Sequence, residues 1–313
     1  MAESVDARDS KSLVLRHIRV RVSSRVFVVA QQHGGQWSAI QSQLGTELAT
    51  GSTVSPMSFD LSDFSLIDML QCGRGLRQSA EQASSITEAA QSIVEYLYAE
   101  CGHPDAARSC ALIRFYKTFP MRELESNLQA FARKQLGDVA PSASMKVLTL
   151  LATIGQQPEW CDPRQSIGHQ AIPLPSAQIV EEAPMIAQLI REMGLDISVV
   201  VSPDVSLLQE SVGRSYNVFH VEQALGSPYI PAQSEFVERY GVRSVLGFGG
   251  LLADGNLFAV IMFSRGLIPA TSAARFRNIA LDVKSVIHPF TVGVSTNRTV
   301  GRGESSETTG EVE

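Results

Sequence analysis

The sequence predicts an α+β fold in which an antiparallel sheet of about six strands is flanked by helices. Two apolar runs, 242–252 and 257–263, are joined by an Asp-Gly pair, which is typical of a β-hairpin. Apolar residues at helical spacing follow over 270–288, and Pro289 ends that stripe. Earlier segments have the length and composition of further strands: 109–117, 145–154, 197–201 and 216–221.

Composition and charge narrow the class of protein. The chain has 313 residues, 44% of them hydrophobic, which is enough for a substantial core. Its net charge of −6 disfavours binding to nucleic acid or to an anionic membrane. The apolar runs are shorter than the roughly 20 residues of a spanning helix, and the N-terminus lacks the apolar core of a signal peptide. We therefore expect a cytoplasmic protein with no nucleic-acid and no membrane partner.

The pattern divides the chain into four parts. Residues 1–60 form an extension in which Val and Arg alternate over 19–28, as in short amphipathic strands. Residues 61–83 read as a helical linker and a candidate dimerisation element, with packing on its own domain as the alternative. The main domain follows over 84–290, and 291–313 is an acidic tail that we expect to be disordered.

Three features mark the middle of the chain. A short helix over 123–137 is inserted between two predicted strands. The segment 155–176 carries four prolines and two glycines, so we expect an ordered loop packed on the domain surface or over a pocket. Pro184 is expected to kink or break the helix over 176–194.

The stretch YGVRSVLGFGGLLADGNLFAVIMFSRGLIP, with the spaced Phe and Ala residues that follow it, resembles the closing half of a GAF domain, a small sensory fold allied to PAS. The resemblance covers 84–289. The inserted helix over 123–137 departs from the tighter hairpin of the family. A GAF-like fold implies a ligand cavity with one wall near His220.

The resemblance and the loop composition suggest a set of ligand-binding residues. His220 precedes a Gly- and Pro-rich segment, and an imidazole there would bind a small ligand or a haem iron, or serve only as a structural hydrogen-bonding group. Tyr229 and Arg243 would neighbour the cavity, and a salt bridge is the alternative role of Arg243. The full candidate set is His220, Tyr229, Arg243, Phe248, Trp160 and His169.

Cysteine chemistry supplies an alternative. Cys161 lies eight residues from His169 and beside Asp162, so a nucleophile–base pair or a thiol redox site is conceivable if these groups meet. The four cysteines form no CxxC pair, which argues against a metal site. The Cys-His pair that is typical of bilin attachment is absent from the sequence. The alternative role of the four cysteines is that of reduced structural thiols.

The sequence favours a non-catalytic GAF-like sensory or regulatory protein of a signalling pathway. We expect it to bind a small ligand or a protein partner, to form a homodimer, and to act on a separate signalling protein such as a kinase. This expectation follows because the chain shows no kinase, cyclase, phosphatase or helix-turn-helix signature. The alternatives are a GAF-fold redox enzyme that uses Cys161 and a haem-based sensor that uses His220. The sequence identifies neither a ligand nor a cofactor.

Overall fold

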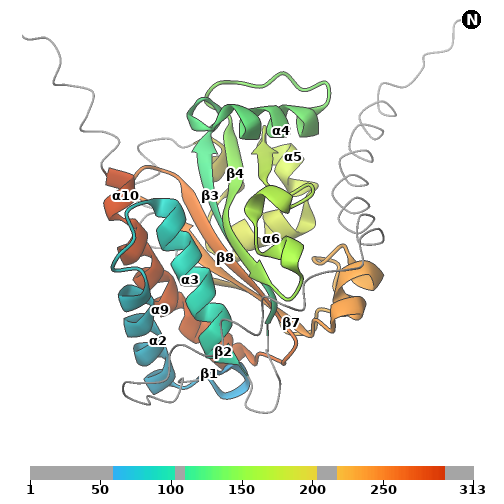
Figure 1. Ribbon diagram of the computed structural model, residues 1–313. Coiled ribbons are helices and arrows are strands. Elements are labelled where there is room, and N and C mark those ends of the chain that lie inside the picture. The colour runs from blue at the N-terminus through green and yellow to red at the C-terminus, as the bar shows by residue number, and fades with distance from the viewer. Residues whose placement is uncertain (1–58, 103–109, 203–216, 293–313) are drawn as a thin grey trace, which may run out of the picture.

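The computed structural model describes residues 59–102, 110–202 and 217–292 (Figure 1). Its main sheet has the strand order β5-β4-β3-β8-β7-β6, and every neighbouring pair is antiparallel. The strands are β3 (Cys110–Pro120), β4 (Lys146–Gly155), β5 (Ala171–Leu174), β6 (Val218–Val221), β7 (Ser244–Leu251) and β8 (Leu257–Ser264). The predicted α+β class and the six-stranded antiparallel sheet are confirmed. The short strands predicted within 1–58 and the tail beyond 292 lie outside the described residues.

Three long helices cover one face of the sheet: α2 (Leu66–Ser79), α3 (Ile86–Glu100) and α9 (Ala270–Ile287). They lie together on the left of Figure 1. Their apolar stripes and one face of the strands form a continuous core, which we call the helix-side core. Its most deeply buried aromatic residues include Phe64, Phe248 and Phe276, which pack ring on ring.

Local signals explain where α2 and α3 begin. The side chain of Ser65 accepts the backbone N–H of Asp68, whose carboxylate accepts the N–H of Ser65, so α2 starts with a complete capping box. The predicted cap of α3 is also present, since Ser85 accepts the N–H of Glu88. The carboxylate of Glu88 instead takes the N–H and hydroxyl of Ser84.

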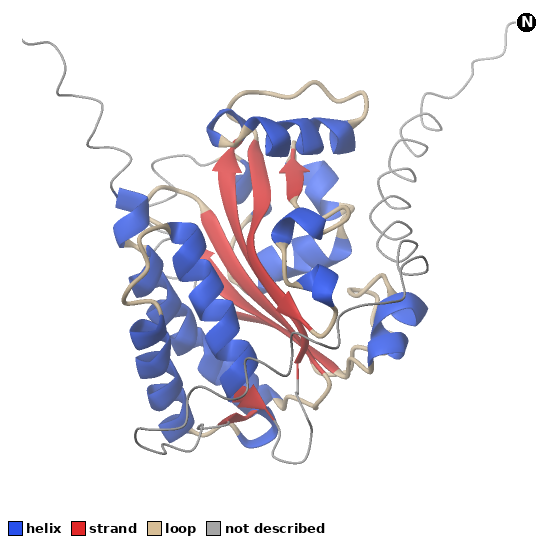
Figure 2. Ribbon diagram, in the orientation of Figure 1, coloured by secondary structure: helices blue, strands red, loops and turns tan. Residues whose placement is uncertain are grey.

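Shorter elements cover the second face of the sheet (Figure 2). They are α5 (Ala177–Glu181), α6 (Pro184–Glu192), α7 (Ile197–Val201), a π-helix (Gln233–Glu238) and the 3-10 turns Pro158–Trp160 and Pro163–Gln165. Pro184 opens a new helix, so the helix expected over 176–194 is broken as predicted. With both faces covered, the side chains in the middle of β3, β7 and β8 are buried.

The identity of one strand differs from the prediction. Residues 197–201 were expected to be a strand but form α7, which Asp196 caps by accepting the N–H of Ser198. Five apolar residues are too few for periodicity to separate strand from helix. The sixth strand is β5, which lies within the predicted loop and pairs its Leu174 with Lys146 of β4.

The remaining described elements sit at the ends of the sheet. The inserted helix is α4 (Ser126–Leu136), which buries Ala132 and Leu136 in a small separate core beyond β3 and β4. A two-residue parallel pair joins β1 (Phe59–Asp60) to β2 (Cys101–Gly102). Short turns are η1 (Leu61–Asp63), η2 (Met121–Glu123) and α10 (Pro289–Val292). No helix among the described residues is long and apolar enough to cross a membrane.

The helix-side core makes a direct prediction about stability. Phe276 is fully buried, and its ring centroid lies 4.8 Å from that of Phe64 and 5.3 Å from that of Phe248. Phe276→Ala is expected to lower the free energy of unfolding by about 3–5 kcal/mol, measured by urea denaturation. Leu281→Ala, on the same helix but 46% exposed, is the control and should cost less than about 0.5 kcal/mol. Equal effects of the two substitutions would contradict this packing.

Candidate functional site

A charged side chain, that of Arg114, lies on the central strand β3. Along β3, Ile113 and Phe115 face the helix-side core, whereas Leu112, Arg114 and Tyr116 face the second side. Arg114 pairs across the sheet with Thr153 of β4 and with Ile261 of β8. It is only 8% exposed, so its guanidinium has lost most of its contact with water.

This guanidinium has few hydrogen-bond partners and no opposite charge among the described residues. Nη1 donates to the hydroxyl of Tyr116 at 3.3 Å and Nη2 to that of Ser166 at 3.4 Å, both at the long end for hydrogen bonds. Nε has no hydrogen-bond partner, and neither has the buried hydroxyl of Thr153 opposite. Within the described part of the chain, no carboxylate forms an ion pair with Arg114. Removing the partner of a buried charge typically costs about 3–5 kcal/mol, so this arrangement is unusual.

The loop over 155–176 supplies the cover of this site. Pro158 and Pro163 each open a 3-10 turn, and the backbone N–H of Leu150 donates to the carbonyl of Gln170 at 2.9 Å. Gly155 lets the indole of Trp160 approach β4, because a Cβ at that position would lie 2.8 Å from Cε3 of Trp160. The loop is therefore ordered and packed on the sheet, as predicted, and Ser166 reaches Arg114 from it.

His169 lies in the same loop, close enough to Arg114 to be affected by its charge. Its Nδ1 is 3.2 Å from the backbone carbonyl of Ile167. The pKa of His169 is lowered from 6.5 to about 3, first because protein atoms surround the ring and second because of the nearby Arg114 charge. The imidazole is therefore neutral at physiological pH. We call Arg114, Tyr116, Thr153, Ser166 and His169 the Arg114 site.

Two other residues predicted from the sequence also lie on this face. The ring of Trp160 packs against Tyr240, with centroids 4.6 Å apart, and against Phe236 at 5.7 Å. Tyr229 packs on the edge of the second-face core. Trp160 and His169 thus belong to one loop over the sheet, and Tyr229 borders the same core.

The other predicted ligand-binding residues lie elsewhere. Phe248 is buried in the helix-side core, on the opposite face of the sheet from His169. Nε2 of His220 donates to the carbonyl of Ile268 at 2.7 Å, which ties β6 to the segment before α9. Arg243 is exposed just before β7. The structure does not bring the six residues of the predicted set together.

The cysteines are also separated. Cys161 is exposed on the loop, and its thiol donates to the carbonyl of Gly155 at 3.4 Å. Cys72, Cys101 and Cys110 are buried in the helix-side core. Burial raises the pKa of Cys110 to about 12, and a hydrogen bond with Cys72 followed by burial raises the pKa of Cys101. Cys161 therefore has no second thiol beside it in the described structure. No group of three or more His, Cys, Asp or Glu residues in the described ranges is placed to hold a metal ion.

A second buried polar cluster lies toward the β7–β8 turn. Nζ of Lys117 pairs with the carboxylate of Asp254 at 3.2 Å and lies 4.0 Å from the centroid of the Phe119 ring. Nζ of Lys146 donates to Oδ1 of Asn256 at 2.6 Å. Both lysines have protein partners, so this cluster is a structural tie between β3, β4 and the turn.

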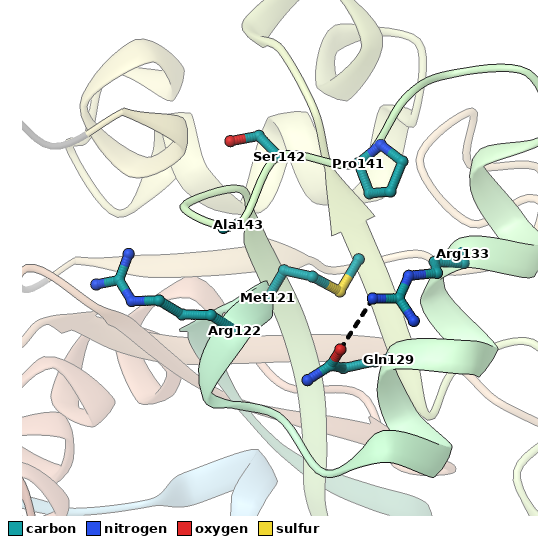
Figure 3. A pocket seen from close by; sticks show the side chains of 7 residues that line it. All are labelled: Met121, Arg122, Gln129, Arg133, Pro141, Ser142 and Ala143. Carbon is teal, nitrogen blue, oxygen red and sulfur yellow. Dashed lines mark hydrogen bonds between the residues drawn. The ribbon is translucent and has the colours of Figure 1, made fainter.

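A surface pocket of about 350 Å³ lies beside α4 (Figure 3). It is lined by Met121, Arg122, Gln129, Arg133, Pro141, Ser142 and Ala143. Figure 3 shows that Arg133 points toward Gln129, to which it donates, whereas Arg122 extends away. No charged groups converge in this open pocket, which makes the Arg114 site the stronger candidate.

Comparisons with known proteins bear on the fold. No family model and no curated protein sequence matches the chain. Among solved structures, the GAF domain of an Acinetobacter phosphoenolpyruvate-protein phosphotransferase is similar at 15% identity, over 72% of this chain and 97% of that one, with a TM-score of 0.35. The GAF domain of a Coxiella burnetii phosphoenolpyruvate-protein phosphotransferase is similar at 13% identity, over 71% and 93%, with a TM-score of 0.37. The photosensory core module of the Stigmatella aurantiaca phytochrome matches at 10% identity, over 74% and 38%, with a TM-score of 0.32.

Two GAF domains are among the similar structures, each with a TM-score below 0.5. Identities of 15% or less and TM-scores below 0.5 carry no information about the ligand, the partner or the mechanism of this chain. The functional argument rests on the Arg114 site itself.

Four residues of that site were not predicted from the sequence: Arg114, Tyr116, Thr153 and Ser166. A signal was present, because Arg114 stands two residues after Leu112 in a strand whose other residues are largely apolar. Position alone places it on a buried face once the strand is known to be central. Its contact with Ser166, 52 residues later, depends on the path of the loop and has no counterpart in the sequence.

The lowered pKa of His169 predicts acid sensitivity. Between pH 6.5 and about 3 the unfolded state binds a proton that the folded state does not, so the free energy of unfolding falls as the pH falls through this window. The loss attributable to His169 at pH 5 is at most about 2 kcal/mol. His169→Gln should remove this part of the dependence in urea titrations at pH 7 and pH 5. His288→Gln, at the exposed end of α9, is the control. An unchanged slope in His169→Gln would contradict the neutral imidazole.

Proposed function

We propose that this protein is a non-catalytic, GAF-like sensory or regulatory protein that binds a small anionic ligand at the Arg114 site. One observation carries the proposal: a guanidinium that is 8% exposed makes two long contacts with hydroxyls and has no acidic partner in the described structure. A bound anion would supply the missing charge and accept the unused Nε–H. Charge-assisted hydrogen bonds of this kind are roughly twice as strong as neutral ones.

The described surroundings favour binding over turnover. Nδ1 of His169 is occupied by a backbone carbonyl, and no hydrogen bond links the ring to Ser166. Cys161 lies apart from the other three cysteines, and Nε2 of His220 is taken by Ile268. These contacts weigh against the thiol-enzyme and haem alternatives and support a role in ligand sensing.

The test compares anion binding in two arginine variants. The wild type is expected to gain about 5–10 °C in Tm at a ligand concentration of about 100 Kd, because ligand binding contributes about 2.7 kcal/mol there. The probes are acetate, propionate, lactate, pyruvate and inorganic phosphate at constant ionic strength, measured by differential scanning fluorimetry. Arg114→Met should abolish the response without lowering the Tm of the free protein, because it removes a buried unpaired charge.

Arg122→Met is the matched control, since this arginine follows the same strand but its side chain is 58% exposed. It should respond to anions as the wild type does. A panel in which no anion stabilises the wild type, or in which Arg114→Met responds normally, would refute the proposal.

We further propose that the signal is passed on by association and that α2 is the surface involved. Leu66, Ile67 and Leu70, in the first two turns of α2, are 60%, 66% and 63% exposed. Asp63 precedes these residues and the exposed Arg74 follows them. An antiparallel pairing of two copies would bury the apolar residues and place Asp63 opposite Arg74, which favours a homodimer. A downstream signalling protein such as a kinase would then act on the assembled form.

The homodimer is tested by replacing Leu66, Ile67 and Leu70 together with Gln. Wild-type protein at about 100 μM is expected to elute as a dimer in size-exclusion chromatography with light scattering, and the triple variant as a monomer, because the substitutions remove the apolar area that association would bury. Leu225→Gln, which changes a separate leucine that is 63% exposed, should leave the dimer intact. A monomeric wild type would refute this surface as a self-association site.

A further inference from the structure

The Arg114 site restricts the chemical class of its ligand more closely than charge alone. This inference rests on the proposed function, because it assumes that an anion occupies the site. Its starting point is two buried atoms without a hydrogen-bond partner, Nε of Arg114 and Oγ1 of Thr153, together with Nε2 of His169, a ring nitrogen of a half-buried residue that accepts no hydrogen bond from the described residues.

The first two atoms favour a carboxylate. The planar guanidinium matches the two oxygens of a carboxylate edge, and the Thr153 hydroxyl lies beside Arg114 on the neighbouring strand and can donate to the same group. Arg114 is the only cation that makes hydrogen bonds within this site in the described residues. A monoanion balances that single charge, whereas a dianion would leave excess buried negative charge.

The third atom can accept a hydrogen bond from a donor on the ligand. A backbone carbonyl only accepts, so the contact with Ile167 places the imidazole proton of His169 on Nδ1. Nε2 then carries a lone pair, and it makes no hydrogen bond with the described residues. The neutral ring can accept from a hydroxyl or an amine. A charged ammonium beside the Arg114 guanidinium would be repelled, so the hydroxyl is the better match.

The packing around the site limits the size of the ligand. Ile261 flanks Arg114 on β8. One strand further, the space above Gly247 is filled, since a Cβ there would lie 2.6 Å from Cδ1 of Leu189. The sheet face is therefore closed on this side, and the apolar remainder of the ligand must be short.

We infer that the ligand is a small hydroxycarboxylate whose carboxylate binds Arg114 and Thr153 and whose hydroxyl donates to Nε2 of His169. A carboxylic acid of the same size without the hydroxyl, or with a ketone in its place, lacks the donor. The site would thus distinguish glycolate and lactate from acetate, propionate and pyruvate.

Isothermal titration of the full-length protein with these five acids tests the inference. The hydroxy acids are expected to bind about tenfold more tightly than their matched partners, which corresponds to one hydrogen bond. His169→Phe keeps an aromatic ring but removes the acceptor, so it should bind acetate and glycolate equally. Arg114→Met should bind none of the acids, and His288→Phe should behave as the wild type.

The outcomes separate this inference from the proposed function. Equal binding of hydroxy acids and their partners by the wild type would overturn the hydroxyl assignment and leave anion binding intact. A preference that persists in His169→Phe would overturn the role of His169. Failure of every carboxylate to bind the wild type would overturn this inference, and the proposed function would be refuted as well if inorganic phosphate also failed to bind. If His169→Phe does not fold, the ¹⁵N shift of His169 Nε2 decides the same point: a change with glycolate but not acetate supports the contact, and equal spectra exclude it.

Discussion

The central strand β3 places a charged side chain in a sheet that is covered on both faces, and the requirement to compensate that charge dominates the second face. Helices α2, α3 and α9 close one side mainly with apolar packing. On the other side, the position occupied by Arg114 cannot be satisfied by apolar contacts, because an ionised group loses its hydration there. The loop over 155–176 brings the Ser166 hydroxyl to it, but a hydroxyl carries no opposing charge. The described residues that cover the sheet therefore provide no negative charge to compensate the Arg114 guanidinium.

The same strand shows how this protein compensates a buried cation when the purpose is structural. Lys117 lies three residues after Arg114 and is just as deeply buried, yet Asp254 pairs with it and an aromatic ring lies against it. Burial lowers the pKa of Lys117, and the Asp254 charge acts in the opposite direction. Nζ of Lys146 donates to the neutral amide oxygen of Asn256 at 2.6 Å, and the Asp254 charge also acts on the pKa of Lys146, in the direction opposite to burial. Of the two buried cations in this strand, Lys117 thus has an acidic partner and Arg114 has none among the described residues. This contrast is the basis for proposing an external anion at Arg114 and not at Lys117.

Much of the fold follows from the sequence because its signals are local. The hairpin, the capped start of α3 and the break at Pro184 each depend on a few adjacent residues whose conformational preferences agree with the final structure. The sequence could not show that 171–174 forms the sixth strand and that 197–201 forms a helix, because a short apolar run is compatible with either structure. Only the pairing of 171–174 with β4 makes that segment a strand. Of the candidate site, composition singled out the loop and His169, whereas Arg114 becomes meaningful only when the strand is known to be central and its neighbours are known to be uncharged.

The geometry also indicates which element an anion would act on. A ligand shifts a conformational equilibrium only as far as it binds the two states differently. When the loop is packed on the sheet, Arg114 is buried and its unpaired charge is costly; if the loop lifts away, water reaches the guanidinium and the cost disappears. An anion paired with Arg114 removes the penalty only from the packed state, so it stabilises the packed loop in particular. Because alternate residues of β3 face the loop side and the helix side, Ile113 and Phe115 lie between Arg114 and the core beneath α2 and α3.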